Sequence, residues 1–201
     1  MDVFEFGQHR LSNEPFQQVD YEKLLGGKKV DLLYTDPPWN EDLMDYYADL
    51  QREQSPEPVV GNLTYSEMLS ELCRIADEHV DGFVVIESQA EDATTLAYVK
   101  KALHNVEYQE VEYRDYACGI YIGSTSPEYT FDVSLRLTSG LDTMRAGIKE
   151  ATDEGDVVMD VMCGKGSVAK AALLEGCTFI GNDFNTQRVN ETKELLEDMT
   201  E

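Results

Sequence analysis

The most constraining feature of this sequence lies near its end, where residues 155–183 read as a strand, a glycine-containing turn, a helix and a second strand. The first strand covers residues 155–161, and the second covers residues 178–183 and ends in Asp183. Such a unit is typical of a sheet whose parallel strands are joined by helices and bind ligands at their carboxyl ends. One further helix, from about Asn185 to Met199, fits after Asp183, so the remaining strands must come from upstream.

The upstream residues alternate between helical and strand-like hydrophobic patterns, which supplies those strands. The expected helices cover residues 64–79, 91–104 and 141–151, and the expected strands cover residues 30–35, 82–87, 106–113, 116–123 and 131–137. Over residues 1–29 we expect a short strand, a loop and a short helix closed by Gly26 and Gly27. This alternation predicts an α/β fold with a doubly wound sheet, mostly parallel with an antiparallel edge, in a single domain over residues 1–201.

The turn after the strand over residues 155–161 has the residues of a ligand-binding loop. Gly164 and Gly166 let a ligand approach the backbone closely at the start of a helix. Asp183 lies 17 residues beyond Gly166, about where a nucleoside-binding fold places its ribose carboxylate. The residues around Lys165 do not have the Gly-x-x-x-x-Gly-Lys-Ser/Thr spacing of a phosphate-binding loop. Ala169 stands where the dinucleotide motif Gly-x-Gly-x-x-Gly has its third glycine. The turn therefore favours a nucleoside cofactor without phosphate groups.

A second motif, Asp36-Pro37-Pro38-Trp39, follows the expected strand over residues 30–35. The Asp36 carboxylate and a neighbouring carbonyl aimed by the two prolines can accept hydrogen bonds, and the Trp39 indole offers a flat π face. This combination suits a planar ring with an exocyclic amine, such as adenine or cytosine. The alternative is a rigid turn with a core tryptophan. Placing this strand beside the one that ends at Asp160 brings both motifs to the same edge of the sheet.

Both motifs resemble those of S-adenosylmethionine-dependent methyltransferases that modify the amino nitrogen of adenine or cytosine in DNA. Asp-Pro-Pro-Trp is a catalytic motif of that family, and residues 160–167 resemble its cofactor motif Asp-Pro-Phe-x-Gly-Ser-Gly-Thr, followed later by Ile-Gly-x-Asp. The matching positions are Asp160, Gly164, Gly166, Ile180, Gly181 and Asp183, whereas Val161, Lys165 and Ser167 depart from the motif. The catalytic motif precedes the cofactor motif, which is the permuted order of the class often called beta.

The resemblance implies a Rossmann-like methyltransferase sheet and transfer of a methyl group from S-adenosyl-L-methionine to an exocyclic amine of a DNA base. Trp39 favours adenine N6 over cytosine N4. The implied catalytic residues are Asp36, Pro37, Pro38 and Trp39. The implied cofactor-binding residues are Asp160, Met162, Cys163, Gly164, Gly166, Ser167, Asp183 and Asn13. Asn13-Glu14 stand near the place of a Gly-Asp pair in the family, and Ser139-Gly140 replace a Lys-Pro pair, so cofactor contacts differ there.

The charge of the chain bears on its partner. The chain has 16 Lys and Arg residues against 40 Asp and Glu residues, a net charge of −24, whereas nucleic-acid binding draws much of its affinity from basic side chains on phosphates. DNA is the expected partner, and a homodimer or a basic protein partner is left open. Two alternatives follow from the acidity. One is a methyltransferase that acts on RNA, protein or a small molecule, and the other is an acidic, partner-dependent or non-catalytic subunit of a methyltransferase complex.

The cysteines and histidines predict no metal site, because the four cysteines form no Cys-x-x-Cys pair and the three histidines form no cluster. No apolar stretch reaches the roughly 18 residues of a membrane span, and the first residues lack a secretion signal pattern. We therefore expect no membrane contact and a location in the cytoplasm of a bacterium or of a phage-infected cell.

Residues 40–62 are polar and acidic, and we expect them to form a mobile loop that acts as a lid over the neighbouring motif. A disordered insertion is the alternative. Nothing between Trp39 and Gly155 resembles an additional domain, so no target-recognition domain is predicted.

Overall fold

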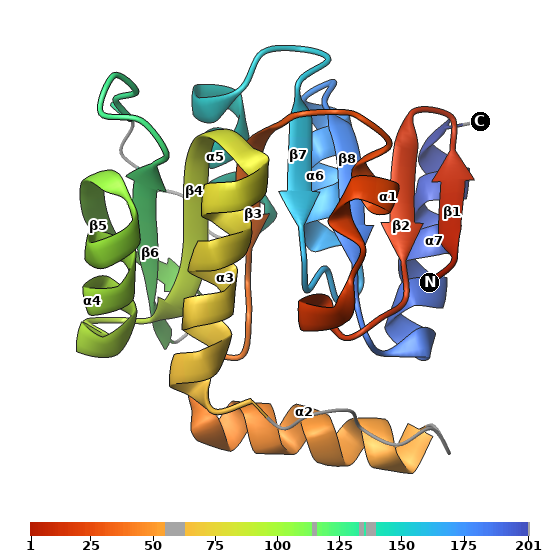
Figure 1. The fold of residues 1–201 in the computed structure, drawn as a ribbon, viewed down its shortest axis with the longest axis horizontal. Helices are drawn as coiled ribbons and strands as arrows, with labels where there is room; N and C mark the ends of the chain where they lie inside the picture. The colour runs from red at the N-terminus through yellow and green to blue at the C-terminus, as the bar shows by residue number, and fades with distance from the viewer. Residues whose placement is uncertain (55–62, 114–115, 133–134, 136–139, 201) are drawn as a thin grey trace.

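A mixed sheet forms the centre of the protein (Figure 1). The structure is a computed structural model and describes residues 1–54, 63–113, 116–132, 135 and 140–200. Within these residues eight strands lie in the order β1-β2-β8-β7-β3-β4-β6-β5. Their bounds are β1 Val3–Phe6, β2 His9–Ser12, β3 Val30–Thr35, β4 Val80–Gln89, β5 His104–Tyr113, β6 Tyr116–Ser124, β7 Val157–Asp160 and β8 Thr178–Asn182.

The middle of the sheet is parallel, whereas both edges are antiparallel. The five adjacent strands β2, β8, β7, β3 and β4 pair in parallel with one another. At one edge β1 pairs antiparallel with β2, and at the other β6 pairs antiparallel with both β4 and β5. This arrangement confirms the predicted α/β fold and its mostly parallel sheet, with antiparallel strands at both edges instead of one.

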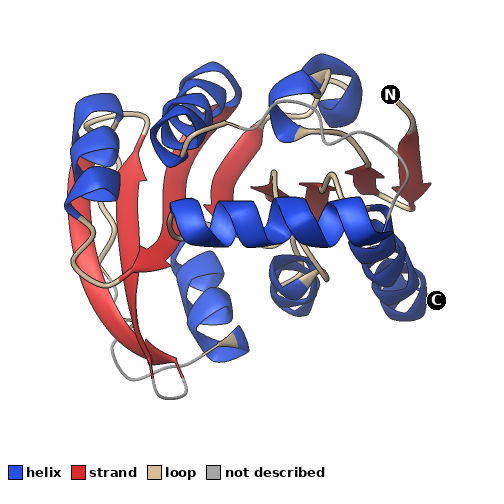
Figure 2. Cartoon of the chain, turned by 90° about the horizontal axis from the view of Figure 1, so that it is seen from below, coloured by secondary structure: helices blue, strands red, loops and turns tan. Residues whose placement is uncertain are grey.

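Helices cover both faces of the sheet, so that the central strands are buried on two sides (Figure 2). On one face lie α1 (Tyr21–Leu25), α3 (Tyr65–His79) and α4 (Ala93–Ala102); on the other lie α5 (Leu141–Ala151), α6 (Ser167–Leu174) and α7 (Thr186–Thr200). Along β3, Leu32 and Tyr34 pack towards the second group of helices, and Leu33 packs towards the first. The alternation of side chains along a strand explains the continuous apolar sequences of these strands.

Local signals in the sequence set the ends of two helices. Thr64 caps α3, because its hydroxyl accepts from the Glu67 backbone N–H and the Glu67 carboxylate accepts from the Thr64 backbone N–H. At the end of α1 the backbone of Gly26 has a φ of 60°, a left-handed conformation that glycine adopts without strain. The first agrees with the helix predicted over residues 64–79, and the second agrees with the short helix predicted to end at Gly26.

The prediction of a loop over residues 40–62 is wrong for its first part, where Glu41–Gln54 form α2. Asn40 begins this helix by accepting a hydrogen bond from the Leu43 backbone N–H over 3.0 Å. Leu43 and Tyr47, one helical turn apart, face the protein, whereas the acidic side chains of this helix are mostly exposed to solvent. These acidic residues gave the segment the composition of a loop. Residues 55–62 lie outside the described residues. The helix crosses the carboxyl-terminal edge of the sheet (Figures 1 and 2).

The strand expected over residues 131–137 is absent at the positions that the structure describes, which are 131, 132 and 135. Phe131 is buried against the Phe83 ring, with 5.8 Å between the ring centroids, and Leu135 is also buried. Phe131 and Leu135 are therefore buried without belonging to a strand. Residues 133–134 and 136–137 lie outside the described part of the chain.

No helix in the described residues is both long enough and apolar enough to cross a membrane.

Candidate active site

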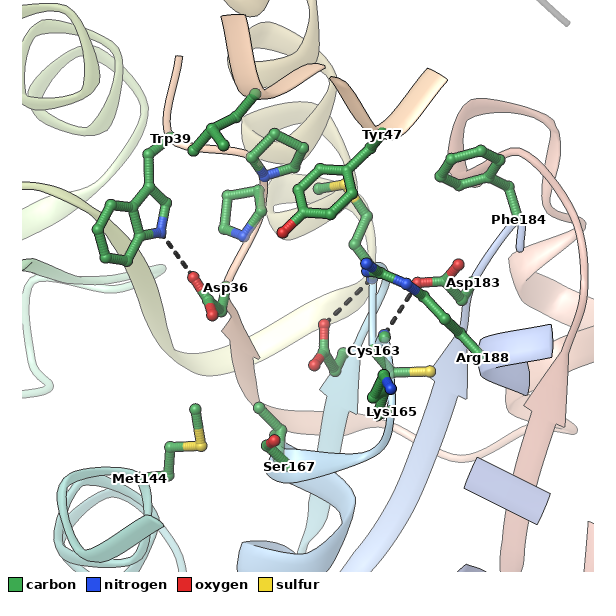
Figure 3. Close-up of a pocket in the computed structure, with 17 residues that line it drawn as sticks. Asp36, Trp39, Tyr47, Met144, Cys163, Lys165, Ser167, Asp183, Phe184 and Arg188 are labelled. Carbon is green, nitrogen blue, oxygen red and sulfur yellow. Dashed lines mark hydrogen bonds between the residues drawn. The ribbon is translucent and has the colours of Figure 1, made fainter. Parts of the chain in front are cut away.

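A cavity of about 410 Å³ opens at the carboxyl ends of β3, β7 and β8 (Figure 3). Strands β3 and β7 pair in parallel, with Leu33 opposite Met159, so the chain leaves both strands at the same edge of the sheet. The strand order runs outward from this pair in two directions, to β8 on one side and to β4 on the other. Such a switch point is where open α/β sheets bind their ligands.

Four segments supply the walls of this cavity: the residues after β3 together with α2, helix α5, the turn between β7 and α6, and the residues from β8 into α7. The lining residues are Asp36, Pro37, Pro38, Trp39, Leu43, Tyr47, Met144, Asp160, Met162, Cys163, Gly164, Lys165, Ser167, Val168, Asp183, Phe184 and Arg188. The two sequence motifs, more than a hundred residues apart in the chain, therefore meet in one cavity.

The Asp36 carboxylate points towards the cavity and is held by the motif itself. Nε1 of Trp39 donates a hydrogen bond to Oδ1 of Asp36 over 2.7 Å (Figure 3). Within the described residues nothing donates a hydrogen bond to Oδ2. The carboxylate is accessible through the cavity, yet it lies deep among protein atoms, and this burial raises its pKa, while the Trp39 hydrogen bond lowers it. Asp36 thus offers one free, basic acceptor.

Asp160 ties the glycine turn to β3. Its carboxyl group is buried, and Oδ1 accepts hydrogen bonds from the Thr35 hydroxyl over 2.8 Å and from the Met162 backbone N–H over 3.1 Å. Burial raises the pKa of Asp160 to about 8, and the two hydrogen bonds oppose this rise. Met162 and Cys163, the next residues of the motif, line the cavity beside it.

Asp183 organises the other side of the glycine turn. Its Oδ2 accepts from the Gly164 backbone N–H over 2.9 Å, and its Oδ1 accepts from the Asn185 backbone N–H over 2.8 Å. Burial raises the pKa of Asp183, whereas these two hydrogen bonds and the positive charge of Arg188 lower it. Each carboxylate oxygen retains a second lone pair, so Asp183 can still accept hydrogen bonds from a ligand.

The two glycines of the turn have different surroundings. Gly164 has a φ of +52° and lines the cavity, where a Cβ atom would lie 3.7 Å from the Arg188 guanidinium. Gly166 has a φ of +83° and packs against α7, where a Cβ atom would come within 2.9 Å of Leu195. Gly166 is not part of the cavity wall, and Ser167, the first residue of α6, is. In this structure Gly166 packs against α7, and its contact with a cofactor stays a prediction.

Asn13 does not line the cavity, although it lies behind the wall. Its amide donates to the backbone carbonyl of Asp183 over 2.8 Å, and its Oδ1 accepts from the Thr186 hydroxyl over 2.8 Å. Asn13 thus joins the end of β2 to the chain between β8 and α7. A contact of Asn13 with a cofactor stays a prediction.

Two residues that no sequence motif indicated, Tyr47 and Arg188, meet in the wall of the cavity. The Arg188 guanidinium of α7 lies 4.5 Å from the centre of the Tyr47 ring of α2, a cation–π contact (Figure 3). Tyr47 belongs to α2, where the sequence predicts a loop, and Arg188 lies five residues past Asp183, a spacing that belongs to no known motif. The signal that could have found Arg188 is its charge, because it is a basic residue next to a predicted acidic site. Phe184, the residue after Asp183, also lines the cavity, and it too belongs to no sequence motif.

Among the described residues, no group of three or more His, Cys, Asp or Glu side chains is arranged to hold a metal ion.

No protein-family model matches the chain, and no curated protein matches it. Solved structures do match it in fold. M1.HpyAVI superposes with a TM-score of 0.64 at 15% identity, over 92% of this chain and 97% of that one. TTHA0409 of Thermus thermophilus, a candidate DNA modification methylase in complex with S-adenosyl-L-methionine, superposes with a TM-score of 0.61 at 16% identity, over 96% and 94%. The cytosine-N4-specific PvuII DNA methyltransferase superposes with a TM-score of 0.61 at 13% identity, over 90% and 89%. The protein therefore has the fold of these proteins.

Proposed function

We propose that this protein is a methyltransferase that uses S-adenosyl-L-methionine to methylate an exocyclic amine of a DNA base, with adenine N6 as the first target and cytosine N4 as the second. The observation that carries this proposal is the shared cavity, in which the Asp36 carboxylate faces the glycine turn of residues 162–166. The fold supports it, since structures of the same fold include a cytosine-N4 DNA methyltransferase and complexes with S-adenosyl-L-methionine.

The cavity suits this cofactor in charge and in shape. S-adenosyl-L-methionine supplies an electrophilic methyl group on a positively charged sulfur atom. The carboxylates of Asp36 and Asp183 lie in the wall, and a positive charge is favoured beside them. Asp183 has free lone pairs for ribose hydroxyls, and Phe184 next to it offers an aromatic face for adenine. The open space beside Gly164 lets the ligand approach the backbone.

Asp36 would act on the methyl acceptor. The lone pair of an exocyclic base amine is delocalised into the ring, which makes the nitrogen a weak nucleophile. Oδ2 of Asp36 can accept an N–H of this amine, and the raised pKa of Asp36 makes it a better proton acceptor than an ordinary carboxylate. Trp39 holds Oδ1, so that Oδ2 stays directed into the cavity, and the indole ring is available to stack on the base.

A base in duplex DNA must leave the stack to reach Asp36, because the carboxylate lies inside a cavity. Single-stranded DNA avoids this cost. We expect the duplex to bind weakly at physiological salt, since the net charge of −24 gives the chain little general attraction for phosphates.

A second candidate function follows from α2, the helix at the mouth of the cavity. Its exposed residues include Glu41, Asp42 and Asp49, which repel a polyanion. This observation favours a methyl acceptor that is not a nucleic acid, such as a protein or a small molecule, or a basic partner chain that carries the DNA. A homodimer and the bacterial or phage-infected cytoplasm remain predictions of the sequence.

The test is transfer of labelled methyl from S-adenosyl-L-methionine to unmodified DNA, single-stranded and double-stranded, at low salt. Asp36→Ala and Asp36→Asn are the variants expected to be inactive, and Asp77→Asn, an exposed change on α3, is the matched control. We expect label in DNA that both Asp36 variants lose, and digestion to nucleosides then identifies the base. Cofactor binding without label in either DNA would contradict the DNA substrate, and no cofactor binding would contradict the whole proposal.

A further inference from the structure

A second buried carboxyl group, that of Glu87, lies beside the Asp36 motif in the sheet. Strands β3 and β4 pair in parallel with Thr35 opposite Ile86, so the next residues of the two strands, Asp36 and Glu87, are neighbours at the carboxyl edge. Asp36 lies two residues after Tyr34, and Glu87 lies two residues after Val85, the partner of Tyr34 on β4. Because side chains alternate along a strand, Asp36 and Glu87 point to the same face of the sheet as Tyr34 and Val85. The Glu87 side chain is 9% exposed and does not line the cavity. Because β4 lies on the side of β3 away from β7, Glu87 lies on the side of Asp36 away from the glycine turn.

Glu87 has hydrogen-bond donors but no cation for a partner. Its Oε1 accepts from the Tyr34 hydroxyl over 2.8 Å, and the Cys118 thiol lies 3.9 Å from Oε2. No lysine, arginine or histidine of the described residues forms an ion pair with it. A buried carboxylate without a cation is costly, and the usual outcome is that the group keeps its proton.

Within the part of the chain that the structure describes, the titratable groups that act on Glu87 are all acids. They are Asp36 and Tyr34 from β3, Asp160 from β7 and Cys118 from β6. Helix α5 covers this face of the sheet with the apolar Met144 and Ile148. Burial and, next, the negative charge of Asp36 raise the pKa of Glu87 to about 8, and the Tyr34 hydrogen bond opposes this rise. At neutral pH the proton rests on Glu87, and Asp36 carries the charge.

We propose that Asp36 and Glu87 form a pair that holds one proton in the free protein, releases it when a cationic ligand enters the cavity, and takes up a proton again during methyl transfer. This inference rests on the proposed function and adds to it a positioning residue, Glu87, which acts through Asp36. A positive charge beside Asp36 stabilises the doubly ionised pair, and its removal favours the protonated form.

The chemistry of transfer balances with this proton. The S–CH₃ bond breaks and leaves its electron pair on sulfur, which becomes a neutral thioether. The amine lone pair forms the N–CH₃ bond, and the nitrogen loses one proton to Asp36, from which the pair takes it up. The cavity thus loses the positive charge of the sulfur and gains a proton on the pair, so its net charge does not change. The sulfur of the product, S-adenosyl-L-homocysteine, carries no positive charge, and the pair that it faces carries one negative charge instead of two.

Calorimetric titration of the full chain in buffers of different ionisation enthalpy tests this inference, because it counts the protons released on binding. We expect proton release with S-adenosyl-L-methionine and much less with S-adenosyl-L-homocysteine. Affinity for the charged ligand should rise by up to about tenfold per pH unit between pH 6 and pH 8. In Glu87→Gln, which keeps the shape of the side chain without its charge, both the proton release and this pH dependence should fall. Glu107→Gln, an exposed change on the edge strand β5, should leave both unchanged.

Tyr34→Phe provides a second variant that keeps Glu87 in place. Loss of the hydroxyl removes a hydrogen bond that lowers the pKa of Glu87, so proton release should move to higher pH. Carboxyl carbon NMR of the free protein gives a readout without ligand: Asp36 should titrate in two linked steps in the wild type and in one step in Glu87→Gln.

Two results separate the failure of this inference from the failure of the proposed function. Binding of S-adenosyl-L-methionine with the same proton release in Glu87→Gln as in the wild type would overturn the pair and leave the methyltransferase proposal standing. Two linked NMR steps for Asp36, with no binding of either ligand, would overturn the proposed function and the release step while the shared proton itself remained.

Discussion

The hydroxyl of Thr35 donates a hydrogen bond to Oδ1 of Asp160 over 2.8 Å and so joins the last residue of β3 to the last residue of β7. The two residues are 125 positions apart in the chain and precede the two halves of the candidate active site. Asp36 follows Thr35, and the glycine turn follows Asp160. One buried hydrogen bond thus fixes the distance between the residue that would act on the methyl acceptor and the loop that would hold the cofactor.

Replacing Asp160 by Asn should make the protein less sensitive to rising pH. Below pH 4 the Asp160 carboxyl is protonated in the folded and the unfolded chain, and it has no effect on the pH dependence. Between pH 4 and pH 8 the unfolded chain loses this proton while the folded chain keeps it, so the free energy of unfolding falls as pH rises. Asn cannot ionise and still accepts from Thr35 and Met162, so the advantage of Asp160→Asn should grow with pH.

Urea unfolding at pH 5, 6, 7 and 8 measures this effect. The difference in unfolding free energy between Asp160→Asn and the wild type should grow by up to about 1.4 kcal/mol per pH unit. Asp142→Asn, an exposed change at the start of α5, is the matched control. A difference that stays constant over this range would mean that Asp160 is ionised in the folded protein.

Replacing Trp39 by Phe should shift the pH dependence of methyl transfer while keeping an aromatic face. The change removes Nε1–H, the donor that lowers the pKa of Asp36, so the pKa of Asp36 should rise. Because transfer needs the ionised Asp36, the acidic limb of the rate profile should move to higher pH. Trp39→Ala removes the aromatic face as well and should lower the rate at every pH. Identical acidic limbs in the wild type and Trp39→Phe would show that this hydrogen bond does not tune Asp36.

The convergence of the main site residues could be predicted from the sequence because it depends on strand order. In a parallel sheet, two motifs that each follow a strand must meet when their strands are adjacent. Strands β3 and β7 are adjacent and parallel. Asp36, Asp160, Gly164 and Asp183 line one cavity for this reason. The capping of α3 by Thr64 was predictable for a different reason, since the capping box is a local pattern.

The features that the sequence did not reveal depend on contacts between distant segments or on a misleading composition. Helix α2 was hidden by its acidic residues, although Leu43 and Tyr47 have helical spacing. Gly166 belongs to the cofactor motif, yet its neighbours are on α7. The position of Glu87 beside Asp36 requires the register of β3 against β4, which hydrophobic periodicity does not contain.

Removing the Arg188 guanidinium should loosen α2. Arg188 is the α7 side of the cation–π contact with Tyr47, and such contacts contribute about 0.5–2 kcal/mol. If α2 opens from this contact, amide hydrogen exchange over residues 41–54 should become roughly 2- to 30-fold faster in Arg188→Ala. Arg52→Ala, on the exposed side of the same helix, controls for the loss of an arginine and should change exchange less. Equal exchange in Arg188→Ala and the wild type would show that other contacts hold α2.

The two glycines of the turn should respond differently to a single added methyl group. In Gly166→Ala the new Cβ would lie 2.9 Å from Leu195 and 3.1 Å from Thr192, at a φ of +83°, so both crowding and backbone strain oppose it. We expect a loss of about 2–5 kcal/mol in the free energy of unfolding. In Gly164→Ala the nearest atom lies 3.7 Å away, so only the strain of about 1–2 kcal/mol applies.

The variants Gly164→Ala and Gly166→Ala also distinguish a structural role from a ligand-binding role, because Gly164 lines the cavity and Gly166 does not. Gly164→Ala should weaken binding of S-adenosyl-L-methionine more than it lowers stability, since its methyl group occupies space that the ligand backbone contact needs. Gly166→Ala should do the reverse at a temperature where it remains folded. Urea unfolding and calorimetric titration on both variants measure the two effects. Equal losses of affinity, once the folded fraction is accounted for, would contradict a ligand in contact with Gly164.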